Sequence, residues 1–158
     1  MNALVLCVGS LKEKWQKDAC AEYLKRLSRY GKYEVCEVPD EPESPRASEA
    51  LDSAVKLREG RALLKCIRPE DYVIALCIDG KALSSEELAR EVRAREQSGR
   101  RTVLVIGGSL GLSDEVTARA DLRLSFSRFT FPHPLMRVIL LEQLYRAAKI
   151  NAGERYHK

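Results

Sequence analysis

The chain has 158 residues, of which 45% are apolar and 32% are charged, and its formal net charge is +4. This size and balance are typical of one soluble globular domain, which we expect to span residues 1–158, and they exclude a disordered chain. The early apolar run Ala3 to Val8 is too short for a signal or membrane segment, so the sequence predicts a cytoplasmic protein without a membrane partner.

The five cysteines do not form a metal-binding or disulfide pattern. They are Cys7, Cys20, Cys36, Cys66 and Cys77. Their number is odd, no Cys-x-x-Cys spacing occurs, and each lies in an apolar strand or helix pattern. We therefore expect reduced thiols in the core and no metal site.

The first half of the chain alternates between strand and helix patterns. Ala3 to Val8 predicts a buried strand, and Lys12 to Arg29 has the apolar period of a helix. Tyr33 to Val38 predicts a second strand. Asp40 to Ser48 contains two prolines and predicts a loop, whose last residue is a suitable N-cap for a helix over Ala50 to Ile67. The residues expected to face inward from the two helices are Trp15, Ala19, Tyr23, Leu24, Leu27, Leu51, Val55, Leu63, Leu64 and Ile67.

The second half continues this alternation. Asp71 to Ile78 is a β-rich run that ends at Asp79-Gly80. Ser84 and Glu87 have the spacing of a capping box, for a helix that runs to about Gln97. The remaining expected elements are a strand over Thr102 to Ile106, a helix over Asp114 to Ala120 capped by Ser113, a strand over Leu122 to Ser125 and a helix over Val138 to Ile150.

The order of these elements predicts the fold class. Strands alternate with helices throughout, and several strands are apolar on both faces. Strands of this kind are buried between two layers of helices in parallel sheets. The sequence therefore predicts an α/β fold with a mostly parallel sheet and flanking helices, without an internal repeat.

The helix over Val138 to Ile150 is apolar on every side of its first turn, Val138 to Leu141. A surface helix needs only one apolar stripe, so this helix must be buried on two sides. One side is its own sheet. The other is a second subunit of a symmetric dimer or, alternatively, more of the same chain.

Basic residues gather in the last part of the chain. From residue 123 onward, seven basic residues face two acids, so this part carries a net charge of +5 and the first 122 residues about −1. The seven are Arg123, Arg128, Arg137, Arg146, Lys149, Arg155 and Lys158. This asymmetry favours a phosphate-rich partner, and a solvated helix face is the alternative.

The turn Gly107 to Gly111 fits three patterns. As Gly-x-Ser-x-Gly it is the nucleophile elbow of serine hydrolases, with Asp114 or Asp121 and His133 as partners of Ser109, but an elbow needs a helix that starts at the serine. The spacing does not fit the dinucleotide fingerprint. The favoured interpretation is a turn whose backbone touches a ligand beyond a strand end, and a tight turn without a ligand is the alternative.

The stretch Leu124 to Arg137 has the most unusual composition. Two serines, a threonine and two arginines interleave with three phenylalanines, and two prolines bracket His133. A stiff, donor-rich loop before a buried helix predicts a ligand-binding turn. We expect Leu76 to Ile78, Gly107-Gly108 and Ser125 to Phe131 to converge on one pocket, because they follow parallel strands.

These motifs together resemble the small SPOUT-superfamily methyltransferases that modify N3 of a pseudouridine in bacterial 23S rRNA. The resemblance runs from end to end, and its most specific segments are Leu124 to Ser127, Thr130 to His133 and Arg137-Val138. The other matching segments are Val8 to Lys12, Glu37 to Pro39, Lys56 to Gly60, Gly80-Lys81, Ser84-Ser85, Val105 to Ser109, Gly111-Leu112, Glu142 to Ala147 and Tyr156 to Lys158.

The resemblance implies a SPOUT α/β fold with a C-terminal trefoil knot and S-adenosylmethionine as the cofactor. It also implies a homodimer in which the partner's C-terminal tail completes the site, and a 23S rRNA stem-loop substrate within the assembled 70S ribosome. The cofactor-binding residues that it implies are Leu76, Gly107, Phe126, Ser127, Arg128, Phe129, Thr130 and Phe131.

Three residues are candidates for the chemistry. His133 and His157 could accept the N3 proton, since histidine titrates near neutral pH, and Tyr156 could stack on the target base. The candidates for RNA phosphates are Arg128, Arg137, Arg146 and Arg155, and the alternative for some of them is to fix the tail or the dimer. The alternative of a different class is a non-catalytic ribosome- or RNA-binding factor on the same scaffold.

Overall fold

The structure is a computed structural model that describes residues 1–42, 45–46 and 48–156. The described strands are β1 (Asn2–Val8), β2 (Lys32–Val38), β3 (Tyr72–Ala82), β4 (Thr102–Ile106) and β5 (Leu122–Ser125). The described helices are α1 (Lys14–Leu27), α2 (Glu49–Leu64), α3 (Ser85–Ser98), α4 (Asp114–Arg119) and α5 (His133–Asn151). Every expected strand and helix is present. The described residues of the expected loop over Asp40 to Ser48 form neither helix nor strand, and its residues 43, 44 and 47 lie outside the described ones.

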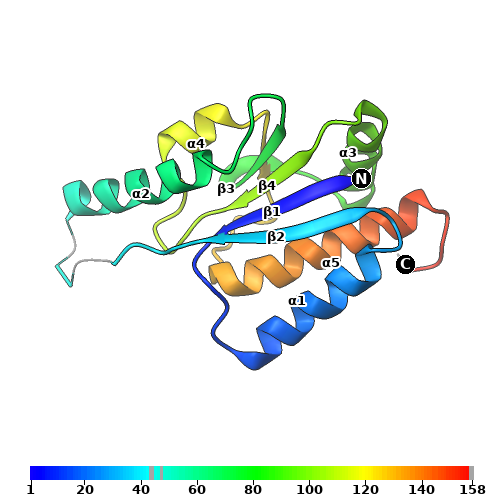
Figure 1. Cartoon of the computed structure of the whole chain (residues 1–158), viewed down its shortest axis with the longest axis horizontal. Helices are drawn as coiled ribbons and strands as arrows, with labels where there is room; N and C mark the ends of the chain where they lie inside the picture. Colours follow the sequence, from blue (N-terminus) through cyan, green and yellow to red (C-terminus); the bar gives the residue numbers. More distant parts are fainter. Residues whose placement is uncertain (43–44, 47, 157–158) are drawn as a thin grey trace.

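The five strands form one parallel sheet in the order β2-β1-β4-β3-β5. Figure 1 shows α2 and α4 on one face of this sheet and α1 and α5 on the other, where α3 packs against α5. The predicted α/β class with a parallel sheet and flanking helices is therefore confirmed. The trefoil knot that the resemblance implies stays a prediction.

Each face of the sheet has its own apolar core. Alternate residues of β1 serve the two faces: Val5 packs in the cluster with α1, α3 and α5, whereas Leu6 packs in the cluster with α2 and α4. Both side chains are fully buried, and each such side chain stabilises the fold by roughly 1.5–3 kcal/mol. The period of two along a strand thus explains why β1 is apolar at every position.

Helix α5 packs against the sheet, and its residues Leu140, Leu141 and Leu144 are fully buried in this contact. Val138 and Ile139, from the same apolar turn, are only partly buried within the one chain. No helix among the described residues is long and apolar enough to span a membrane.

All three predicted N-cap residues lie at helix starts, and two of them accept a cap hydrogen bond. The capping box of α3 is present: Glu87 donates its backbone N–H to the Ser84 hydroxyl at 3.2 Å, and its carboxylate accepts from the Ser84 N–H at 2.7 Å. Ser113 caps α4 by accepting from the Val116 N–H. Ser48 occupies the N-cap position of α2 but makes no cap hydrogen bond through its side chain.

The predicted end of the third strand at Asp79-Gly80 is wrong. Strand β3 continues to Ala82, and both Leu76 and Lys81 pair with Leu124 of β5, so the residues between them form a bulge. A Cβ on Gly80 would lie 2.7 Å from the backbone of Leu124. The glycine therefore marks a close approach of two backbones and not the end of a strand.

Two residues expected to face inward are exposed. Trp15 and Leu51 retain 53% and 47% of their accessible surface. Both lie in the first turns of their helices, and Figure 1 shows the first turns of α2 beyond the carboxyl edge of the sheet. The apolar period identified which face of each helix is directed inward. It could not show how far the sheet extends beneath the first turns of the helices.

A buried ion pair holds the opposite, amino edge of the sheet. The Asp71 carboxylate accepts hydrogen bonds from Arg101 Nε at 2.9 Å and from the Arg68 N–H at 2.7 Å, and Arg101 Nη2 also donates to it. Burial alone would raise the pKa of Asp71, but these hydrogen bonds outweigh it and hold the pKa below its ordinary value.

We expect Asp71→Asn to lower the free energy of unfolding at pH 7 by roughly 2–4 kcal/mol, because Arg101 loses its charged partner. The depressed pKa of Asp71 means that its contribution is present above the unfolded pKa of about 3.9 and is lost as the pH falls through the lower folded value. The stability difference between wild type and variant should therefore narrow in acid. Urea unfolding from pH 7 to pH 3 measures this, and equal stability at pH 7 would contradict it.

Candidate active site

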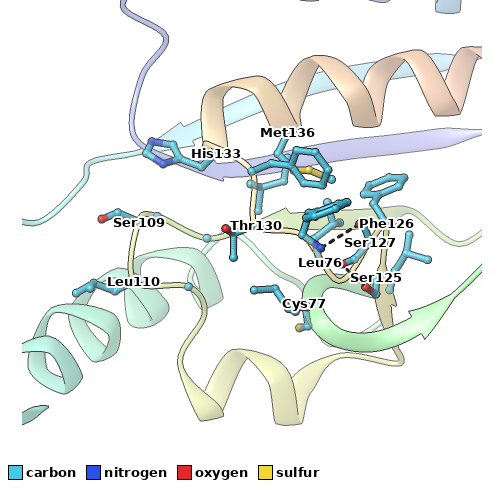
Figure 2. A pocket seen from close by; sticks show the side chains of 18 residues that line it. Leu76, Cys77, Ser109, Leu110, Ser125, Phe126, Ser127, Thr130, His133 and Met136 are labelled. Atoms are coloured by element: carbon cyan, nitrogen blue, oxygen red, sulfur yellow. Dashed lines mark hydrogen bonds between the residues drawn. The ribbon is translucent and has the colours of Figure 1, made fainter.

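A cavity of about 270 Å³ opens at the carboxyl edge of the sheet, where β3, β4 and β5 end and α5 begins (Figure 2). It is lined by seven of the eight residues expected to bind the cofactor, namely Leu76, Gly107, Phe126, Ser127, Phe129, Thr130 and Phe131. The eighth, Arg128, is exposed and does not line the cavity. Three segments far apart in the sequence meet here because their strands are neighbours in the sheet.

The glycine turn after β4 forms one wall. The Gly111 N–H donates to the Gly108 carbonyl at 3.0 Å and closes the turn. A Cβ on Gly107 would lie 2.8 Å from the backbone carbon of Gly111, and Gly111 itself has a φ of +84°. Both positions therefore need glycine, and the absence of side chains leaves backbone groups open to a ligand.

The loop after β5 forms the opposite wall. The Ser125 hydroxyl donates to the Ser127 carbonyl at 3.1 Å, and the Ser127 hydroxyl accepts from the Phe129 N–H at 3.0 Å, as Figure 2 shows. These local bonds fold the serines into the loop and turn Phe129 outward, where 78% of its surface is exposed at the cavity mouth. The alternating serines and phenylalanines of the sequence thus form a turn that is held by hydrogen bonds between its own residues, with Phe129 exposed at its edge.

His133 begins α5 and lines the cavity. We expected a loop here, but Pro132 and Pro134 occupy positions where a helix start tolerates proline, so α5 begins five residues earlier than the predicted Val138. Figure 2 shows the His133 ring directed away from Phe126, and its Nε2 would lie 3.7 Å from a Cβ on Gly9. Sequence reasoning missed Met136, which lines the cavity one helical turn after His133.

Arg137, expected to contact RNA, lies beneath this site and is only 1% exposed. Its guanidinium pairs with Glu37 of β2 and donates to the Gly9 carbonyl at 2.9 Å. Nearby, burial raises the pKa of the Cys7 thiol to about 12. In this arrangement Arg137 joins α5 to the ends of β1 and β2 and presents no charge to a surface ligand.

Tyr156 lies far from the cavity in its own chain. Its hydroxyl donates to Glu142 at 3.1 Å, its ring meets the Tyr145 ring edge-on at 4.9 Å, and Arg146 covers it at 4.7 Å. Because a helix rises about 1.5 Å per residue, Glu142 lies about 13 Å along α5 from His133. The structure therefore does not bring His133 and Tyr156 together within one protomer.

The remaining predicted residues are dispersed. Arg146 makes hydrogen bonds of 2.6 and 3.1 Å with Glu142, whereas Arg155 is exposed near the end of the chain. His157, a predicted catalytic residue, lies outside the described residues.

The serine-hydrolase alternative does not fit the geometry. Helix α4 starts after Ser113 and not at Ser109, so there is no nucleophile elbow. Asp121 accepts from the Val73 N–H at 2.8 Å, which places it at the start of β3 and at the other edge of the sheet.

The cavity is mainly apolar and offers several hydrogen-bonding groups. Its lining residues are mainly apolar or glycine, with the hydroxyls of Ser109, Ser125, Ser127 and Thr130, and include no Asp, Glu, Lys or Arg. Burial raises the pKa of the Cys77 thiol, which lines the cavity as a neutral group. Among the described residues, no group of three or more metal-binding side chains is found. Fold and site together define a parallel α/β protein that binds an organic cofactor at its strand ends.

Comparison with known proteins gives the family. Residues 1–157 match the family described as "Predicted SPOUT methyltransferase". The chain is 55% identical over 159 residues to "Ribosomal RNA large subunit methyltransferase H" of Clostridium novyi. It is 52% identical over 159 residues to the protein of that name in Bifidobacterium adolescentis. Both alignments cover 100% of this chain and 100% of the relative. A crystal structure described as "Probable Methyltransferase from Bordetella pertussis Tohama I" shares the fold, with a TM-score of 0.58 and 14% identity over 93% of this chain and 94% of that one.

The chain belongs to the SPOUT methyltransferase family. It is therefore a methyltransferase and not a non-catalytic binding factor, and its cofactor is S-adenosylmethionine, which the family uses. The cavity fits this group, since the open backbone of Gly107 and Gly111 and the apolar side chains of Leu76 and Phe126 suit a nucleoside, and the hydroxyls suit its polar edge.

Proposed function

We propose that this enzyme methylates N3 of a pseudouridine in a 23S rRNA stem-loop on assembled ribosomes. The observation that carries the proposal is the full-length identity of 55% to a protein named as a methyltransferase of large-subunit rRNA, together with a cavity at the strand ends. The cytoplasm is the compartment that this substrate requires.

The residues of the cavity position the reaction. S-adenosylmethionine, when bound, supplies a methyl group that needs no further activation. N3 of pseudouridine carries a proton, which must leave before the nitrogen can attack. His133 is the proposed acceptor of that proton, because it lines the cavity and an imidazole nitrogen can accept a proton. The hydrogen bonds of Ser125 and Ser127 within their own loop fix the cavity wall.

We propose RNA contacts for the basic residues that are exposed to solvent. Arg128, in the loop after β5, and Arg155 are exposed, and we propose that both bind RNA phosphates. Arg146 already pairs with Glu142 and covers Tyr156, so we propose that it contacts RNA only together with the tail. We propose that Arg137 stabilises the site by joining α5 to Glu37 and to the Gly9 carbonyl.

A homodimer is part of the proposal. Tyr156 lies beside the middle of α5 and not at the cavity of its own chain. Val138 and Ile139 are incompletely covered in one protomer, and Trp15 and Phe129 are exposed. A second copy would cover apolar surface of this kind and could bring the tail, with Tyr156 and His157, to the cavity of its partner.

Transfer of labelled methyl groups from S-adenosylmethionine tests the substrate. We expect label at N3 of the pseudouridine in 70S ribosomes that lack the modification, and at least about tenfold less on free 23S rRNA, because a chain of this size makes few RNA contacts of its own. Equal transfer to free rRNA would overturn the ribosome requirement. Label at another base would overturn the assigned position.

A further inference from the structure

A second cavity, of about 270 Å³, lies between the C-terminal halves of α1 and α5. Figure 1 shows these two helices side by side, with their C-terminal ends on the right of the view. Among the described residues it is lined by one acid, two tyrosines and four cations, and the cations are Lys25, Arg26, Arg29 and Lys149. None of these residues lines the cofactor cavity, so the second cavity needs an explanation of its own.

The second cavity carries an excess of positive charge. The acid in its lining, Glu22, is bonded to Arg26 at 2.7 Å. A neighbouring acid, Glu154, pairs with Lys149 and lies 3.8 Å from Arg29. Four cations therefore face these two acids, which leaves a net charge of +2. The dipoles of the two helix ends, about half a negative charge each, make cations favourable here but still leave the cavity positive.

Two tyrosine rings complete the wall of the second cavity. The guanidinium of Arg26 lies over the Tyr145 ring at 5.8 Å, and that of Arg29 lies over the Tyr30 ring at 5.9 Å. RNA-binding surfaces combine cations, which bind phosphates, with aromatic rings and guanidinium planes, on which bases stack. A solvated helix face also carries cations, but it needs neither a cavity nor aromatic walls. The second cavity thus has the composition of a nucleic-acid site.

The second cavity adjoins the C-terminal tail. Tyr145 in its wall meets the Tyr156 ring edge-on at 4.9 Å, and the Tyr30 hydroxyl donates to Glu154 at 3.0 Å. Arg155, between these two tail residues, is exposed. The tail and the second cavity therefore form one continuous basic and aromatic surface. If the tail meets the target nucleotide, as proposed above, the second cavity meets the RNA beside it.

We propose that the second cavity binds the phosphodiester backbone of the substrate RNA next to the target nucleotide. The inference rests on the proposed rRNA substrate and on the proposed role of the tail. Lys25 and Arg29 are the expected phosphate ligands, because both are exposed, whereas Lys149 is held by Glu154. Such contacts position the RNA without reading its sequence. They supply affinity for rRNA that the cofactor cavity, with neither Lys nor Arg in its lining, does not.

Cosedimentation of the full-length enzyme with 70S ribosomes that lack the modification, in KCl from about 50 to about 200 mM, tests the inference. In the double variant Lys25→Gln, Arg29→Gln we expect the Kd for ribosomes to rise about tenfold or more. The slope of log Kd against log salt should fall by about two, since each phosphate contact releases about one counterion. The calorimetric Kd for S-adenosylmethionine should stay within about twofold, because neither residue lines the cofactor cavity.

The double variant Arg61→Gln, Lys65→Gln is the matched control. It removes one arginine and one lysine, both exposed and four residues apart, from the C-terminal end of α2 on the opposite face of the sheet. The total charge changes by the same amount as in the first variant, but the second cavity is unaltered. We therefore expect its Kd for ribosomes and its salt slope to stay close to those of wild type.

Three outcomes would overturn the inference. Equal weakening in both double variants would show that only the total charge matters, and an unchanged Kd and slope in Lys25→Gln, Arg29→Gln would show that the second cavity does not contact rRNA. Conversion of that variant from dimer to monomer, measured by light scattering, would assign the second cavity to the subunit interface. Failure of the wild-type enzyme to methylate ribosomes would instead overturn the proposed function itself, which separates the two kinds of failure.

Discussion

Replacing Gly107 by alanine is expected to weaken S-adenosylmethionine binding at least about tenfold, equivalent to about 1.4 kcal/mol. A Cβ at this position would lie 2.8 Å from the carbonyl carbon of Gly111 and 2.9 Å from its oxygen. Both are backbone atoms of the same turn, so no side chain can rotate away to relieve the contact. The turn must open, and its backbone groups then leave the cavity wall. Calorimetric titration of the variant measures the loss.

Gly99→Ala is the matched control for this variant. Gly99 ends α3 with a φ of +67°, and a Cβ there would meet nothing within 4 Å. Alanine should therefore cost roughly 1 kcal/mol of stability through the left-handed backbone, without any effect on the cavity. A Gly107→Ala protein that binds the cofactor as tightly as Gly99→Ala would show that the glycine turn is not a cofactor wall.

The layout of the fold could be predicted from the sequence because burial on both faces leaves a distinctive pattern. Strands β1 and β4 are apolar at almost every position, and this happens only when helices cover both sides of a sheet. Parallel strands then place their carboxyl ends at one edge, so Leu76, Gly107 and Phe126 could be expected in one cavity from the sequence alone.

The errors arose where a residue type has two uses. Asp79-Gly80 is typical of a turn, but glycine also permits close backbone approach, and only the pairing of Leu124 with both Leu76 and Lys81 shows the bulge. Proline usually ends an ordered segment, yet Pro132 and Pro134 start α5.

Charged residues were the hardest to place. Arg137 belongs to a basic stretch and was expected to contact RNA, but its hydrogen-bond partners Glu37 and Gly9 come from more than 90 residues earlier in the chain. Glu59 of α2 likewise has the sequence context of a solvated helix face, but it retains only 5% of its accessible surface. Long-range pairing of this kind leaves no local periodic signal, which is why burial of single charges could not be predicted.

Removing Tyr156, His157 and Lys158 is expected to lower methyl transfer at least about hundredfold while the Kd for S-adenosylmethionine stays within about twofold. The cofactor cavity lies at the start of α5, whereas Tyr156 is held beside its middle by Glu142 and Arg146. The truncation therefore leaves the cavity of its own chain unchanged, and a loss of transfer would come from the tail alone. Equal methyl transfer by truncated and full-length enzyme would contradict a role for the tail.

Mixed dimers decide which cavity the tail serves. A truncated protomer keeps its cavity and lacks a tail, whereas a Gly107→Ala protomer keeps its tail and has a defective cavity. If the tail crosses to the partner, the mixed dimer contains one complete site and recovers about half the activity of wild type at S-adenosylmethionine concentrations too low to fill the Gly107→Ala cavity, although each variant alone transfers far less. If the tail serves its own chain, no complete site exists in the mixture and no activity returns. Because Tyr156 is bound to Glu142, which lies about 13 Å along α5 from His133 in the same chain, we expect the first result.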